Sequence, residues 1–229
     1  MLVEIYSDLV CPWCYIGEAR FDRALETFPH RDQVEVVLRP FQLDPEAPVP
    51  GTPLISYLEG RYGAQARAMM EQAGEAAEAE GLAVDWEQAQ VANTLDAHRL
   101  LRMVVWKEGA EVQRQLAKAL FRLHFVQGGD LSDPEVLASL AERQGLDRQE
   151  VGAFLASDEG MEATRDAMEY ARGIGISSVP TFVFQGRWGI RGAQPPEAFT
   201  RMLDQVLERM EEGADLEEGA DGQEGADHE

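Results

Sequence analysis

Residues 2–17 read LVEIYSDLVCPWCYIG, and this stretch decides the fold because a strand pattern gives way to a helical pattern across two cysteines. Its first six residues alternate and include β-branched side chains, which is typical of a strand. Cys11 and Cys14 follow, and helical spacing then continues to the helix breaker Pro29. A second strand is predicted over 34–43, VEVVLRPFQL. These segments predict a right-handed βαβ unit with both cysteines at its first strand-to-helix junction.

The rest of the chain divides into a helical block and a second α/β segment. Residues 54–157 show recurring helical patterns and almost no strand pattern, which predicts an all-helical insertion. A further helix is expected to lead into a β-hairpin over 179–190 and a last helix ending near Met210. We therefore predict an α/β protein with a βαβ-α-ββα core over 1–53 and 158–210, interrupted by a large all-helical insertion.

Charge and hydropathy exclude several classes of partner. The net charge is −22, and residues 211–229 alone contain nine acidic and no basic residues. Residues 1–210 carry 33 acidic and 20 basic side chains, a net charge of −13 that disfavours nucleic-acid binding. No apolar run approaches the ~20 residues of a membrane span, and no secretory leader pattern opens the chain. We expect a cytoplasmic protein with no membrane partner and a disordered acidic tail over 211–229.

The CPWC stretch favours dithiol chemistry. Cys11 falls where a strand ends and a helix starts, so its sulfur can face the unpaired N–H groups of the helix N-terminus. Pro12 suits the first helical turn, and Cys14 should be the more buried partner. Two alternatives stay open. A metal site would have to recruit histidines that lack ligand spacing, and two inert buried thiols would leave the proline unexplained.

Val179 and Pro180 form a second candidate feature. Proline inside a strand removes a hydrogen-bond donor, so it belongs at the first position or an edge. A cis peptide bond here would leave the backbone of Val179 free to bind an extended substrate by strand addition, whereas an ordinary trans proline at a strand start is the alternative.

These residues resemble a known family. The predicted core, CPWC at its first helix, the helical insertion and SVPTF at the third strand are similar to DsbA-type thioredoxin-fold oxidoreductases. The blocks SDLVCPWCYIG, NTLDAHRLL, ALFRLHFVQGGDLSD, GISSVPTFVF and GAQPPEAF resemble the FrnE-like branch, in the family's order, to about Met210. The resemblance implies that Cys11 is the attacking thiol, Cys14 the resolving thiol and Pro180 a cis proline facing them. Val179 would then contact substrate through its backbone.

The resemblance also implies supporting residues. Asp8 matches an acidic position that would assist proton transfer at Cys14 or cap the loop. Asn93 and His98 match a block that would line a substrate groove, although a packing role for the histidine is the alternative, and Gln194 would touch substrate.

The chain also departs from the family. Trp13 follows Pro12 where strongly oxidising relatives have histidine, so we expect a less oxidising pair. Any relay through a second cysteine pair is excluded, because the chain has no other cysteine.

Three functions remain in competition at this stage. The first is a thiol–disulfide oxidoreductase of the reductase or isomerase type, acting on a protein or small-thiol substrate and recharged by a cellular thiol reductant. It needs no metal and no cofactor, although glutathione could serve as co-substrate. The second is a glutathione-dependent enzyme like kappa-class glutathione transferases and 2-hydroxychromene-2-carboxylate isomerases, which typically have serine in place of Cys11. The third is a chaperone or peptide-binding protein. The oligomeric state is left open.

Overall fold

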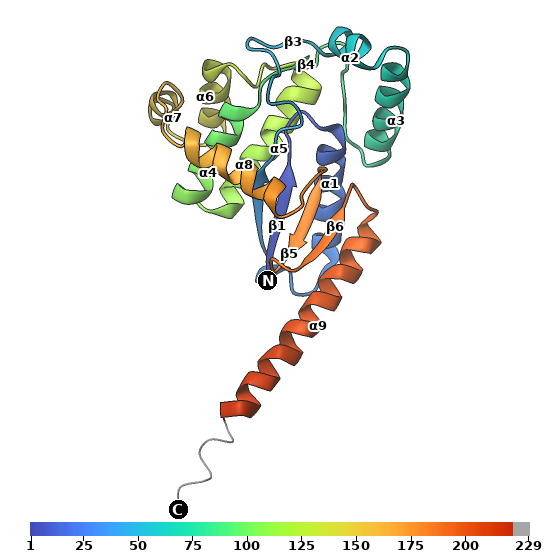
Figure 1. Cartoon of the computed structure of the whole chain (residues 1–229), viewed down its shortest axis with the longest axis vertical. Coiled ribbons are helices and arrows are strands. Elements are labelled where there is room, and N and C mark those ends of the chain that lie inside the picture. The colour runs from blue at the N-terminus through green and yellow to red at the C-terminus, as the bar shows by residue number, and fades with distance from the viewer. Residues whose placement is uncertain (222–229) are drawn as a thin grey trace, which may run out of the picture.

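A four-stranded mixed sheet forms the centre of the molecule (Figure 1). The computed structural model describes residues 1–221. The strand order is β2-β1-β5-β6, with β1 parallel to β2 and the other neighbours antiparallel. Strand bounds are Leu2–Ser7 for β1, Glu35–Pro40 for β2, Thr181–Phe184 for β5 and Trp188–Arg191 for β6.

Two helices cover one face of this sheet. Helix α1 (Pro12–Thr27) connects the parallel strands, and α9 (Pro196–Asp221) packs beside it. Phe21, Phe182 and Phe199 are fully buried between helices and sheet, with Phe182 and Phe199 rings 4.6 Å apart edge to face. Burial of these rings out of water is the main stabilising contribution on this face.

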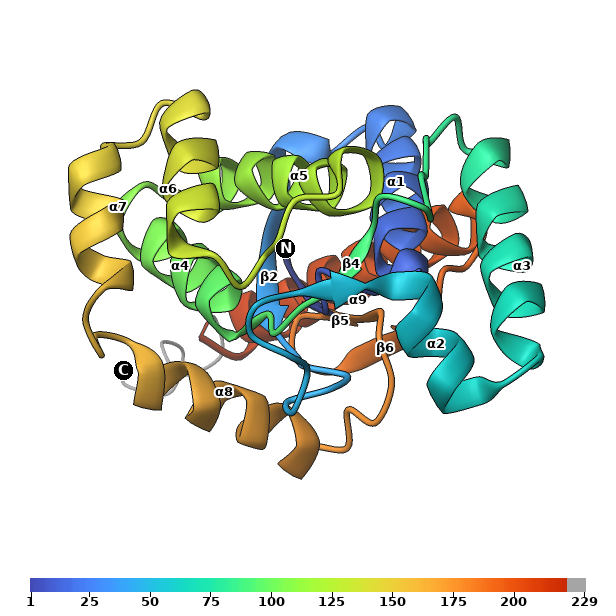
Figure 2. The same cartoon turned by 90° about the horizontal axis from the view of Figure 1, so that it is seen from above.

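Helices α2 to α8 follow β2 in the sequence. Seen from above, they lie on both sides of the sheet (Figure 2). Helices α4, α5 and α8 pack against β2, while α2 and α3 form a pair that lies across from α1. A 3₁₀ turn, η1, spans Arg31–Gln33. The helix bounds are Leu54–Tyr62 for α2, Gln65–Ala79 for α3, Leu95–Lys107 for α4, Ala110–Gln127 for α5, Pro134–Arg143 for α6, Arg148–Leu155 for α7 and Met161–Gly173 for α8.

One of the hydrophobic clusters contains side chains from both sequence segments. Tyr15 of α1 stacks on Phe121 and Phe125 of α5, with ring centroids 5.5 and 5.4 Å apart. Cys11 and Cys14 belong to the same buried cluster. The aromatic stack therefore joins the first helix, and both thiols with it, to the inserted helices.

The predicted fold class is confirmed, with three differences in detail. Helix α2 was not predicted as a separate element. Short strands β3 (Thr52–Pro53) and β4 (Gln90–Val91) pair antiparallel, so the insertion is not wholly helical. Helix α9 continues to Asp221, beyond the predicted end at Met210. The sequence of 211–221 contains no proline and several good helix formers, which allows this extension. Helix α9 covers the first part of the tail predicted over 211–229, whose disorder stays a prediction, and residues 222–229 lie outside the described residues.

Candidate active site

Cys11 occupies the N-cap of α1. Its backbone is extended (φ −90°, ψ 114°), and its carbonyl accepts the first helical hydrogen bonds, from Cys14 N at 3.0 Å and Tyr15 N at 3.2 Å. Pro12 opens the helix, where its missing N–H leaves no bond unmade. Cys11 N donates to Asp8 O at 3.1 Å, so a tight turn links β1 to the helix. This local geometry places the sulfur at the positive end of α1.

Cys14 lies one turn further along and is 1% exposed. Burial, followed by its interaction with Cys11, raises the pKa of the Cys14 thiol well above its usual value. The backbone N–H of Asp8 donates to Cys14 Sγ at 3.5 Å. Both cysteines are free thiols in this structure. Cys14 can therefore act as a thiolate only if its proton finds an acceptor when the thiol reacts.

The loop before β5 faces Cys11. The Val179–Pro180 peptide bond is cis, and Cys11 Sγ lies 4.0 Å from the carbonyl oxygen of Val179. On the helix side of this contact stands Gly17, where an added Cβ would come within 2.9 Å of Pro180 Cγ and 3.4 Å of Ala193. Sequence reasoning missed Gly17, although a glycine inside a helical pattern can signal close packing.

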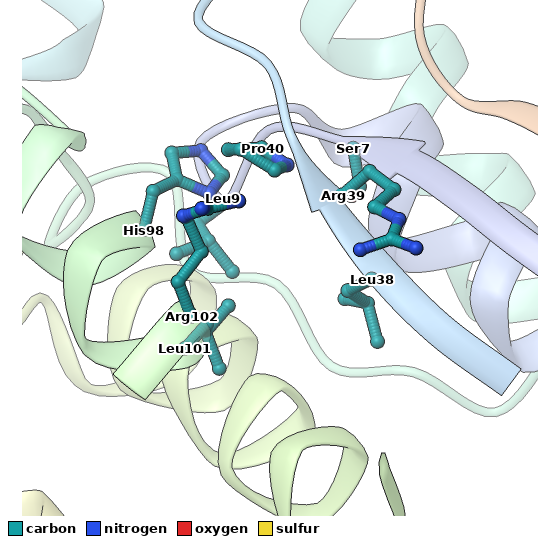
Figure 3. Close-up of a pocket in the computed structure, with 8 residues that line it drawn as sticks. All are labelled: Ser7, Leu9, Leu38, Arg39, Pro40, His98, Leu101 and Arg102. Atoms are coloured by element: carbon teal, nitrogen blue, oxygen red, sulfur yellow. The ribbon is translucent and has the colours of Figure 1, made fainter. Parts of the chain in front are cut away.

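Asp8 and His98 meet in a buried polar contact beside β2. Asp8 Oδ2 accepts from Leu43 N at 2.7 Å, and Asp8 Oδ1 lies 3.4 Å from His98 Nε2. Figure 3 shows the side chains of His98 and Arg102, both from α4, close together beside β2, the strand that carries Arg39. The side chains of Asp8 and His98 are 1% and 3% exposed, so this pair is an internal feature and not part of an open groove.

Asn93 and Gln194 lie elsewhere. Asn93 accepts from Gln42 Nε2 at 3.0 Å and donates to Pro45 O at 2.9 Å, which ties the start of α4 to the loop after β2. Gln194 donates to Arg191 O at 2.9 Å on the protein surface. Neither these two residues nor His98 lines the cavity at Cys11, so the structure does not bring the three proposed groove residues to the thiol.

A cavity of about 250 Å³ opens beside the CPWC stretch. Cys11, Pro12 and Trp13 form one wall, and the opposite walls come mainly from α2 and α3. Sequence reasoning missed the contribution of α2 and α3 to this lining, because helical periodicity shows that a helix has an apolar face but not which surface that face meets. In the described residues, 1–221, no cluster of His, Cys, Asp or Glu could hold a metal ion. Within this same part of the chain, no helix is long and apolar enough to cross a membrane.

The structure thus places a dithiol at the N-terminus of the first helix of a thioredoxin-like sheet, facing a cis proline. The model of the DsbA-like thioredoxin domain matches residues 2–204, and the chain belongs to this family. The family resemblance found in the sequence is therefore confirmed.

Similar proteins fit this assignment. A probable DsbA oxidoreductase from Streptomyces coelicolor, SCO1869, is 40% identical, with a TM-score of 0.83 and 90% of each chain covered. The uncharacterized protein YwbO of Bacillus subtilis is 27% identical over 88% of this chain and 94% of its own length. The cytosolic disulfide reductase DsbM from Pseudomonas aeruginosa, solved with GSH, shares the fold at 18% identity, with a TM-score of 0.64 and coverage of 91% of this chain and all of DsbM.

Proposed function

We propose that the protein is a thiol–disulfide oxidoreductase of the reductase or isomerase type. The observation that carries the proposal is the position of Cys11, which is 4% exposed and lies at the N-terminus of α1, on the wall of a cavity and 4.0 Å from Val179 O, with Cys14, 1% exposed, one turn further along the helix. An attacking thiol needs access and an electropositive environment, and a resolving thiol needs proximity.

The reaction follows from this arrangement. The Cys11 thiolate attacks one sulfur of a substrate disulfide, so a mixed disulfide forms and the other substrate sulfur leaves as a thiolate. Cys14 loses its proton and attacks Cys11 Sγ, which forms the Cys11–Cys14 disulfide and releases the second substrate thiol. The substrate gains two electrons, and a cellular thiol reductant returns two electrons to the enzyme. The backbone of Val179, beside Pro180, would hold an extended substrate during attack.

A reducing compartment sets the direction of this cycle. We propose that the protein works in the cytoplasm, where thiol reductants keep accessible dithiols reduced. The description of DsbM as a cytosolic disulfide reductase supports this direction. A glutathione-dependent isomerase or transferase has no use for Cys14, so the presence of a buried second thiol favours disulfide exchange.

Turnover of a protein disulfide with a thiol reductant tests the proposal. Cys11→Ser should abolish turnover, because no attacking sulfur remains. Cys14→Ser should retain the first attack and accumulate a mixed disulfide on Cys11, visible by mass spectrometry. Undiminished turnover in Cys11→Ser would refute the assignment. Glutathione conjugation or isomerisation that survives unchanged in Cys14→Ser, without any disulfide turnover, would favour the glutathione-dependent enzyme.

A further inference from the structure

The loop that contains the cis proline depends on residues 192–194 for its position. The carbonyl oxygen of Pro180 accepts from Gly192 N at 2.8 Å. Gly192 has a φ of +78°, and Gln194 N donates back to Gly192 O at 2.9 Å, so the chain turns tightly between β6 and α9. A displacement of residues 192–194 would therefore move Pro180 and, with it, the backbone of Val179.

Arg20 of α1 holds this turn in place. Its Nη1 donates to the backbone carbonyl oxygen of Ala193 at 2.6 Å. Arg20 comes three residues after Gly17, where an added Cβ would lie 3.4 Å from Ala193, so the turn packs along one face of α1. Because the donor is charged, this hydrogen bond is stronger than one between two neutral groups. Arg20 therefore fixes residues 192–194 between α1 and Pro180.

The guanidinium of Arg20 also binds a carboxylate of the helical insertion. Arg20 Nε donates to Oε1 of Glu80, the C-cap residue of α3, at 2.7 Å, and Arg23 Nη1 donates to Glu80 Oε2 at 2.5 Å. Burial alone would raise the pKa of the Glu80 carboxyl, but the hydrogen bonds from Arg20 and Arg23 lower it below its usual value. Glu80 thus stays charged, and its carboxylate fixes the orientation of the Arg20 side chain.

Arg20 and Arg23 share one partner but differ in reach. A guanidinium can make two contacts at once because its donors form a rigid planar fork. Arg20 uses this fork to join Glu80 to Ala193 and is 19% exposed, whereas the side chain of Arg23 is 56% exposed and pairs with Glu80. Since α3 packs beside α1 (Figure 2), Arg20 links three parts of the fold: α1, the end of α3 and the turn before α9.

We propose that Arg20 is a positioning residue for disulfide exchange, which holds the loop at Val179 and Pro180 where the Val179 backbone can bind an extended substrate. The inference rests on the proposed function and concerns the same site. Arg20 stands outside the described lining of the cavity at Cys11, so it acts through residues 192–194. Turnover of polypeptide disulfides should therefore depend on Arg20, whereas turnover of very small disulfides should not.

Two disulfides of different length test this role. The first is an extended peptide disulfide, and the second is hydroxyethyl disulfide, which is too small to reach the Val179 backbone while it reacts at Cys11. In Arg20→Gln we expect kcat/KM for the peptide to fall about tenfold, mainly through a higher KM, because the loop loses a charge-assisted hydrogen bond. Turnover of hydroxyethyl disulfide and the pH profile of Cys11 alkylation should stay as in the wild type.

Two further variants locate the effect. Arg23→Gln is the matched control, because it removes the other arginine hydrogen bond to Glu80 and leaves the contact of Arg20 with Ala193 intact. It should turn over both disulfides as the wild type does. Arg20→Lys keeps the charge, so it serves as the second variant if Arg20→Gln does not fold. Its single ammonium cannot reproduce both contacts, and we expect kcat/KM for the peptide alone to fall at least about threefold.

Unchanged peptide turnover in the Arg20 variants, an equal fall for the two disulfides, or the same fall in Arg23→Gln would overturn the positioning role while disulfide exchange stands. Absence of Cys11-dependent turnover of both disulfides by the wild type would overturn the proposed function, and the role of Arg20 with it.

Discussion

Asp8 contacts the resolving thiol with its backbone and His98 with its side chain. Cys14 is buried, so the proton that leaves it during resolution needs an acceptor on the protein. The Asp8 carboxylate is the candidate, because the backbone amide of the same residue donates to Cys14 Sγ. The side-chain oxygen of an asparagine at this position can still accept from Leu43 N. Asp8→Asn therefore removes the charge and retains the hydrogen bond that holds the loop.

We predict that Asp8→Asn slows the resolution step by about tenfold or more, because general-base assistance by a positioned group is lost. Stopped-flow release of the second substrate thiol measures this rate, and its pH profile should move to higher pH. A resolution rate equal to the wild type across the pH range would reduce Asp8 to a loop-capping role.

Glu18 is a buried carboxyl group on α1 whose pKa is raised to about 7, mainly by burial and then by Asp22, against the opposing effect of Arg114. The folded state therefore binds a proton that the unfolded state has lost between about pH 4.5 and 7, so stability falls as pH rises through this range. We predict that Glu18→Gln raises the free energy of unfolding at pH 8 by up to about 3 kcal/mol, with little change at pH 4. Urea denaturation at both values tests this.

His124 changes stability with pH in the opposite direction to Glu18. It is fully buried, neither ring nitrogen has a hydrogen-bond partner, and burial lowers its pKa to about 4 against the opposing field of Asp8. Its contribution to stability is present above about pH 6.5 and is lost as the pH falls towards 4. His124→Leu should stabilise the protein at pH 4.5 by up to about 3 kcal/mol.

The contributions of Glu18 and His124 to the pH dependence of stability nearly cancel in the wild type between pH 4.5 and 6.5. A variant that lacks one of the two groups should therefore show the pH dependence that the other group causes. A parallel pH dependence in wild type and His124→Leu would show that the pKa of this histidine is the same in the folded and the unfolded state.

At the scale of elements, the contact of α1 with the loop before β5 depends on the absence of a side chain at Gly17. We predict that Gly17→Ala lowers stability by about 1–3 kcal/mol and reduces turnover, because the new Cβ pushes Pro180 away from the helix. Gly152→Ala in α7 is the control. No atom lies within 4 Å of its added Cβ, so it should raise stability by up to about 1 kcal/mol and leave turnover unchanged.

The elements differ in how far the sequence could predict them. Strand β1, helix α1 and the thiols between them could be predicted, because alternation, helical spacing and Pro12 all agree over one short stretch. Helix α2 could not be separated from the loop before it, since its nine residues present only one buried side chain, Leu54. The ends of α9 and the pairing of β3 with β4 depend on weak or distant interactions that leave little periodicity.

The site was predictable to a similar degree. The dithiol and Pro180 follow local rules of strand and helix termini. The positions of Asn93, His98 and Gln194 relative to Cys11 depend on how separate elements pack, and this information is absent from local sequence patterns.

At the scale of the whole molecule, Tyr15, Phe121 and Phe125 join the two sequence segments within one buried cluster. We predict that Phe121→Ala lowers the free energy of unfolding by about 3–5 kcal/mol and that the protein still unfolds in one transition. Far-ultraviolet circular dichroism, which reports mainly on the helices, and tryptophan fluorescence should then give the same midpoint. Two separated midpoints would instead indicate segments that fold independently.

Because both sulfurs are embedded in this shared core, reactivity and folding draw on the same side chains. Substitutions that loosen the aromatic stack would change how easily Cys14 gives up its proton. Substitutions that change the reactivity of the thiols would in turn change the stability of the fold. Over evolutionary time, such a protein can change its redox behaviour only as far as the folded state remains stable.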